Sequence, residues 1–165
     1  MKEYLMEWKA AIAAFFMALG AFLGWQGVMA VVWVVVMAID YITGTAAAIK
    51  AKDWSSAVAR QGLWHKGGMI AVVVVSGIAD SVMVIICEHL PIGIAWTCII
   101  LPLVLAWYIV TELGSILENA VRMGAAVPAW LVKLLRASLK AVEDQGTAVE
   151  DEAEILINDY NPKNE

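Results

Sequence analysis

Charged residues are scarce in this chain of 165 residues: they make up 16% of it, and apolar residues make up 62%. Ordinary soluble domains have about 25% charged and about 45–50% apolar residues. With only two cysteines, the chain has no disulfide framework or Cys-rich zinc site. Its net charge of −5 and the lack of a DNA- or RNA-binding motif argue against a nucleic-acid partner. Together these shortages exclude a soluble globular domain and favour a small integral membrane protein.

Residues that could carry out chemistry are sparse as well. His65 and His89 are far apart, and neither has a His or Cys at metal-ligand spacing. Cys87 and Cys98 lie near the ends of neighbouring apolar segments, so they are either two free thiols or a disulfide pair. No catalytic constellation is present. We therefore predict neither an enzyme nor a cofactor or metal site.

The membrane spans are predicted from the gaps between charges. Residues 10–39 are an uncharged run of 30 residues. As one helix this run would extend about 45 Å, more than the roughly 30 Å of a bilayer core. A Gly-Trp-Gln-Gly sequence at residues 24–27 predicts a tight turn that divides the run into a helical hairpin. The prediction is an all-α membrane protein with four transmembrane helices, at residues 4–24, 27–49, 67–87 and 90–124.

The basic residues support this topology. Two lie at or near the start of the first predicted span, at residues 2 and 9, four lie between residues 50 and 66, and five lie from residue 122 onward. All of them then fall on one side of a four-helix model. By the positive-inside rule, both termini lie in the cytoplasm of a bacterium and the chain is multi-pass in its cytoplasmic (inner) membrane. A three-helix model with residues 10–39 as one span would separate the N-terminal lysines from the others. A cleaved signal peptide and a second start at Met6 are weaker alternatives.

The composition changes after Gly124. Residues 125–142 form a basic amphipathic helix, which is suited to lie on an anionic lipid surface. Its candidate membrane-surface residues are Trp130, Lys133, Arg136 and Lys140. Packing of this helix against a partner helix is the alternative. Residues 143–165 hold eight acids and one lysine, which predicts a mobile cytoplasmic tail after a transmembrane domain of residues 1–124.

Three acids lie inside predicted spans, namely Asp40, Asp80 and Glu112. Each costs several kcal/mol in a membrane unless it is paired or hydrated. Small or polar residues share their helix faces: Thr43, Gly44, Ser76, Ser115 and Asn119. Because the predicted spans contain no paired base, the acids are expected to face water, headgroups or another subunit. The faces could line a pore or an oligomer interface, could cap loops and hold helices together, or could form an ion-coupled site.

Two blocks of residues carry a resemblance. The first is Asp40-Tyr-Ile-Thr-Gly44, followed by Lys50, Ser55, Ser56, Gly62 and Lys66. The second is Glu112-Leu-Gly-Ser115-Ile-Leu-Glu118-Asn119, followed by Gly124 and Pro128. These blocks resemble the phage holins of the toxin-secretion and phage-lysis type. The resemblance implies a homo-oligomer that permeabilises the cytoplasmic membrane at a set time. An endolysin or a toxin then reaches the cell wall, with no direct contact between the two proteins required.

The family pattern marks residues without defining their roles, so the following assignments are hypotheses. Asp40 and Glu112 supply the polar oligomer or pore face, and Gly44 allows close helix packing. The residues that shape the cytoplasmic loop, or tie the last span to it, are Ser55, Ser56, Gly62, Lys66, Glu118 and Asn119. The competing functions are a small non-lytic ion channel or transporter, and a membrane adaptor protein.

Overall fold

The computed structural model describes the backbone of residues 2–89 and 96–159, and the side chains of residues 24–89 and 96–155. This part of the chain is organised as four helices. They are α1 (Lys2–Ala51), α2 (Ser56–His89), α3 (Ile100–Arg122) and α4 (Ala129–Asp159). The predicted all-α class is confirmed.

Three segments are long and apolar enough to cross a membrane: Gly24–Ala51, Ser56–His89 and Ile100–Arg122. They correspond to the second, third and fourth predicted spans. However, α2 begins 11 residues before residue 67, and α3 begins at Ile100, later than predicted. The side chains of the predicted first span, residues 4–24, lie almost entirely outside the described ones. The count of four spans therefore stays a prediction.

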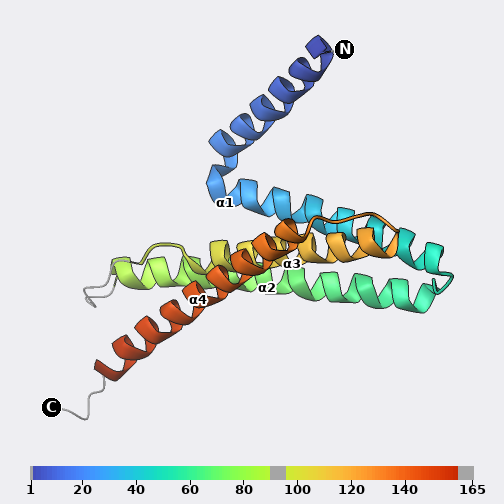
Figure 1. Ribbon diagram of the computed structural model, residues 1–165. Helices are drawn as coiled ribbons and strands as arrows, with labels where there is room; N and C mark the ends of the chain where they lie inside the picture. The colour runs from blue at the N-terminus through green and yellow to red at the C-terminus, as the bar shows by residue number, and fades with distance from the viewer. Residues whose placement is uncertain (1, 90–95, 160–165) are drawn as a thin grey trace.

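The predicted tight turn over residues 24–27 is wrong: the helix is only kinked, at a single residue. Gly24 alone has non-helical angles, with φ 70° and ψ 173°, and helix continues on both sides of it. A positive φ is accessible to glycine because it lacks a Cβ. Figure 1 shows the segment before Gly24 leaving the other helices at an angle.

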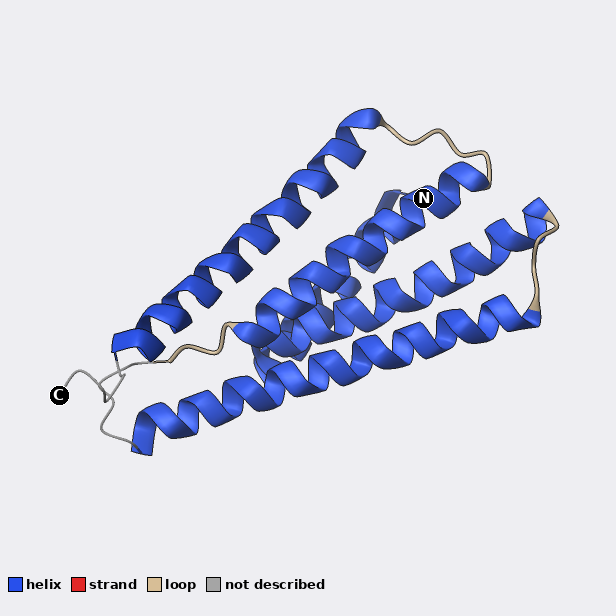
Figure 2. Ribbon diagram, turned by 90° about the horizontal axis from the view of Figure 1, so that it is seen from below, coloured by secondary structure: helices blue, strands red, loops and turns tan. Residues whose placement is uncertain are grey.

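The part of α1 that follows Gly24 runs side by side with α2 and α3 (Figures 1 and 2). α3 packs against α1, α2 and α4, whereas α1 and α2 contact each other only slightly. Residues 52–55 connect α1 to an antiparallel α2, and α3 returns parallel to α1. The end formed by residues 50–56 and 122–124, here called the loop end, is joined by an ion pair between Arg122 Nη2 and Asp53 Oδ2 at 3.3 Å.

The apolar core of this three-helix bundle is small. Trp33, Met69 and Leu105 form its buried cluster, and the Trp33 ring stacks on Tyr108 with their centroids 5.9 Å apart. Large apolar side chains instead cover the outer surface, including Val72, Val74, Val75, Ile78, Val82 and Ile85 of α2. Such a surface is suited to lipid, which is as apolar as the side chains themselves.

α4 is one helix from Ala129 to Asp159, so the helix continues past the predicted domain boundary at residue 143. Pro128 lies immediately before it, and the Pro128 carbonyl accepts a hydrogen bond from the Leu131 N–H at 3.0 Å. The predicted mobility of the acidic segment is not tested by this helical conformation. α4 packs against α3, outside the core that α1, α2 and α3 form.

Candidate functional site

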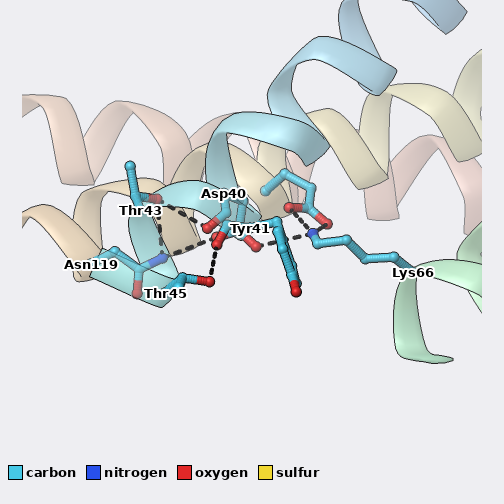
Figure 3. A network of polar contacts seen from close by, with 7 residues as sticks. Asp40, Tyr41, Thr43, Thr45, Lys66 and Asn119 are labelled. Atoms are coloured by element: carbon cyan, nitrogen blue, oxygen red, sulfur yellow. Dashed lines mark hydrogen bonds and ion pairs between the residues drawn. The ribbon is translucent and has the colours of Figure 1, made fainter. Parts of the chain in front are cut away.

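An ion cluster joins the three spanning helices inside the bundle. Lys66 of α2 donates to Asp40 Oδ2 of α1 at 3.0 Å and to both carboxylate oxygens of Glu112 of α3, at 2.7 and 2.8 Å. Figure 3 shows the Lys66 side chain extending from its helix toward Asp40. One ammonium group therefore connects all three helices.

Asn119 and Thr43 extend the cluster toward the loop end. The Asn119 amide donates to Asp40 Oδ1 at 3.1 Å and to Thr43 Oγ1 at 3.3 Å (Figure 3). Gly44 lies directly beneath this amide, and a Cβ at Gly44 would stand 3.4 Å from Asn119 Nδ2. A small residue at position 44 therefore permits the close approach of α1 and α3 at this point. We call Asp40, Thr43, Lys66, Glu112 and Asn119 the ion cluster.

Heptad-like spacing places these side chains on the inner faces of their helices. On α3, Leu105, Glu112 and Asn119 recur at intervals of seven residues. On α2, the inward residues Lys66, Met69, Val73, Ser76 and Asp80 recur at alternating intervals of three and four. Two turns of helix take about seven residues, so each series stays on one face.

The cluster is almost entirely shielded from solvent. The side chains of Asp40, Lys66 and Glu112 are 18%, 11% and 6% exposed, respectively. The expectation that the intramembrane acids have no base to pair with is therefore wrong. The prediction that Gly62 and Lys66 lie in a cytoplasmic loop is wrong, because α2 starts at Ser56 and contains both residues. The charge of Lys66 marks the edge of the uncharged run without ending the helix. Two carboxylates and one ammonium give the buried cluster a formal charge of −1.

Asp80 lies apart from the ion cluster and has a different environment. It is buried at the opposite end of the bundle, where it caps the first turn of α3 from the neighbouring helix. Its carboxylate accepts hydrogen bonds, between 2.7 and 3.2 Å long, from Trp96 Nε1 and the backbone N–H groups of Ile99, Ile100 and Leu101. A carboxylate here also complements the positive end of the helix dipole.

Lys50 caps the C-terminal end of α3, as Asp80 caps its N-terminal end. Its ammonium group donates to the carbonyl of Met123, the C-cap residue of α3. A base near a helix C-terminus is favourable for the same electrostatic reason that favours an acid at the N-terminus. Sequence reasoning missed this role, although Lys50 stands in the first block of the resemblance.

The remaining predicted residues are dispersed. Ser76 is buried and donates to the Val73 carbonyl at 2.8 Å, while Ser55 Oγ accepts from the Val58 N–H at 3.2 Å and so caps α2, whose first residue is Ser56. Ser115, Glu118 and Arg136 line a cavity of about 460 Å³ between α3 and α4, away from the ion cluster. The other candidate surface residues of α4 are exposed: Trp130, Lys133 and Lys140.

Cys87 and Cys98 are both free thiols in this structure. Across residues 24–89 and 96–155, no group of three or more His, Cys, Asp or Glu side chains is placed to hold a metal ion. The ion cluster, with its own ammonium group in the centre, thus remains the principal concentration of ionisable groups within the spans.

Comparison with known proteins places the chain in a family. The model of the bacteriophage holin family matches residues 17–140, which include the whole ion cluster. The chain belongs to the bacteriophage holin family. The chain is also similar to the uncharacterized protein BH0965 of Halalkalibacterium halodurans, with 33% identity over 126 residues that cover 76% of this chain and 87% of that protein. No solved structure matches the chain. The toxin-secretion subtype suggested by the resemblance stays a prediction.

Proposed function

We propose that this protein acts as a holin of a bacterial cytoplasmic membrane, where it forms a homo-oligomer and permeabilises the membrane at a set time. An endolysin or a toxin would pass through the lesion without needing to bind the protein directly. Family membership and the three candidate spans support this role. They also favour it over a non-lytic channel, an adaptor or an enzyme.

The observation that carries the proposal is the ion cluster that joins α1, α2 and α3. Polar groups inside a bilayer are costly unless they are paired or hydrated. In the packed bundle they are paired with one another. If the helices separate in an oligomer, Asp40, Lys66 and Glu112 need water, so they are suited to line a water-filled lesion. The cluster thus holds the inactive bundle together and supplies the polar face of the active one.

The remaining predicted residues act around this centre. By the positive-inside rule, the basic residues of the loop end support a cytoplasmic position for that end. Trp130, Lys133 and Lys140 then lie on the cytoplasmic side, where they can bind the anionic leaflet. Asp80 and Ser76 stabilise the bundle at the opposite end, and Gly44 allows the close packing of α1 on α3.

Inducible expression in a bacterium tests the function. Membrane potential and culture density are followed with and without a co-expressed cytoplasmic endolysin. Sudden depolarisation after a delay, with lysis only when the endolysin is present, is the expected result. Depolarisation without endolysin-dependent lysis would contradict passage of a protein, and no depolarisation with the protein in the membrane would contradict the holin role.

The double variant Asp40→Ala with Glu112→Ala tests the role of the cluster in the same assay. It removes both carboxylates, and we expect it to reach the membrane fraction but to lose timed lysis. The matched control is Glu150→Ala with Asp151→Ala, which removes two exposed acids of α4. Unchanged lysis timing in the cluster variant would contradict the assignment.

A further inference from the structure

The inner faces of the three spans are arranged in layers along the bundle. The ion cluster forms a polar layer near the loop end. Trp33, Met69 and Leu105 form an apolar layer next to it, because Trp33 precedes Asp40 by seven residues and Leu105 precedes Glu112 by seven. Seven helical residues correspond to about 10 Å along the bundle. Ser76 and Asp80 are buried further along α2, beyond this apolar layer.

A cavity of about 310 Å³ extends between α1 and α2 from the loop end to the ion cluster. Asp53 and Arg122 lie at its loop end, and Asp40 and Lys66 line its inner part. The remaining lining residues are mostly small or polar, including Gly44, Thr45, Ala48, Ser55, Ala59 and Gly62. The cavity exists because α1 and α2 each pack on α3 and contact each other only slightly.

Exposure falls from the cavity toward the centre of the bundle, where Glu112 and Leu105 lie behind the residues that line the cavity. The Asp40 side chain is 18% exposed and that of Glu112 is 6% exposed, while Leu105 in the apolar layer is 0% exposed. The cavity thus reaches the ion cluster from the loop end, and no residue of the apolar layer lines it. A polar approach that ends at an apolar constriction is the arrangement by which hydrophobic gates exclude water and ions.

The apolar layer contains one polar group without a partner. Trp33 is 4% exposed, and within the described residues its indole N–H has no hydrogen-bond acceptor. A buried donor without an acceptor costs roughly 1–3 kcal/mol, and a water molecule would remove that cost. Trp33 is therefore the place in the layer where an entering water would be stabilised.

We propose that the cavity is an aqueous vestibule through which water and small cations reach Asp40 and Lys66 from the loop end, and that Trp33, Met69 and Leu105 form a hydrophobic gate that closes the path beyond them. This path belongs to a single chain and is separate from an oligomeric lesion that passes a protein. The proposal depends on the membrane placement of the three spans and does not depend on lytic activity.

Cysteine accessibility tests the vestibule in full-length protein in membrane vesicles. Cys87 and Cys98 are first replaced by serine, and single cysteines are then introduced at Gly62 and at Gly68. A side chain at either glycine meets no atom within 4 Å, but Gly62 lines the vestibule whereas Gly68 is exposed on the outer surface of α2. Ala57→Cys, near the start of α2, marks the loop side. The probe is a membrane-impermeant cationic thiosulfonate, which reacts with the ionised thiol.

We expect Gly62→Cys to react at least tenfold faster than Gly68→Cys, and only when the probe is on the side from which Ala57→Cys reacts. Equal rates at the two glycines, or reaction of Gly62→Cys from the opposite side, would overturn the vestibule. Neither outcome depends on an endolysin, so failure of the lytic role and failure of the vestibule are distinguishable.

Ser76→Cys tests the gate, because Ser76 lies beyond the apolar layer. We expect no reaction from the loop side with the layer intact, and reaction after Leu105→Ala is added. Leu105→Met is the volume-matched control that keeps the gate closed. Reaction of Ser76→Cys from the loop side with the layer intact would overturn the gate. The gate would also be overturned if Ser76→Cys did not react in the Leu105→Ala background while Gly62→Cys in that background still did.

Discussion

The ammonium nitrogen of Lys66 lies between the two carboxylate oxygens of Glu112, at 2.7 Å from Oε2 and 2.8 Å from Oε1. This contact joins α2 to α3 inside an apolar bundle, and the same nitrogen also contacts Asp40 of α1. In a membrane the alternative partner for these groups would be lipid, which offers no hydrogen bonds. The pairing is therefore a specific attachment between helices whose other contacts are largely apolar.

Lys66→Met removes this central charge and leaves Asp40 and Glu112 buried without a counter-charge. We expect the free energy of unfolding to fall by about 3–5 kcal/mol, the usual cost of breaking a buried ion pair from one side. SDS-induced unfolding in mixed micelles, followed by circular dichroism, measures it. Lys133→Met is the matched control, because Lys133 is exposed on α4. Equal stability of the two variants would contradict the role of Lys66.

Asp80→Ala removes the acceptor of the hydrogen bonds that begin α3. Hydrogen bonds to charged groups contribute about 1.5–3 kcal/mol each. Since the freed backbone N–H groups can find some other partners, we expect a loss of about 3 kcal/mol in the same unfolding measurement. Asp80→Asn keeps an acceptor oxygen and should lose less. The exposed neighbour Ser81 provides the control Ser81→Ala, and an equally small effect of Asp80→Ala would refute the capping role.

Gly44→Leu introduces a side chain where Asn119 approaches α1. A Cβ alone fits, at 3.4 Å from Asn119 Nδ2, but the rest of a leucine would displace the amide and break its hydrogen bond to Asp40. Overpacking typically costs about 1–3 kcal/mol. We therefore expect Gly44→Ala to be tolerated and Gly44→Leu to be destabilised by about 2 kcal/mol. Gly68→Leu, which meets open space, should leave stability unchanged within about 0.5 kcal/mol.

Charge gaps and spacing were enough to predict much of this architecture. The second to fourth predicted spans correspond to the three candidate spans. Glu112 and Asn119, which the sequence analysis assigns to one helix face, both belong to the ion cluster. The sequence analysis assigns Ser115 to the same face of this helix, but Ser115 lines the cavity beside α4. A stripe defined by helical period alone is wide enough to include two neighbouring faces of a helix.

The error at Lys66 has a different origin. A lysine at the edge of an uncharged run predicts the end of a span, but the spacing of three between Lys66 and Met69 puts Lys66 on the inner face of α2. That signal was present in the sequence. For Asp80 the sequence left capping as one of several readings, because its backbone N–H partners lie about 20 residues away and only the packed fold brings them within reach.

Gly124→Ala tests the end of α3. Gly124 has a φ of 91°, and a Cβ there would lie 3.1 Å from Lys50 Nζ, the group that contacts the Met123 carbonyl. For an alanine the left-handed conformation costs about 1–2 kcal/mol, so we expect a loss of that size in the free energy of unfolding. Gly114→Ala is the control: it lies within α3, meets no atom within 4 Å, and should instead gain up to about 1 kcal/mol from helix propensity. If both alanines raised stability, the backbone at Gly124 would not need glycine, and the α3 C-terminus would have to end in another conformation.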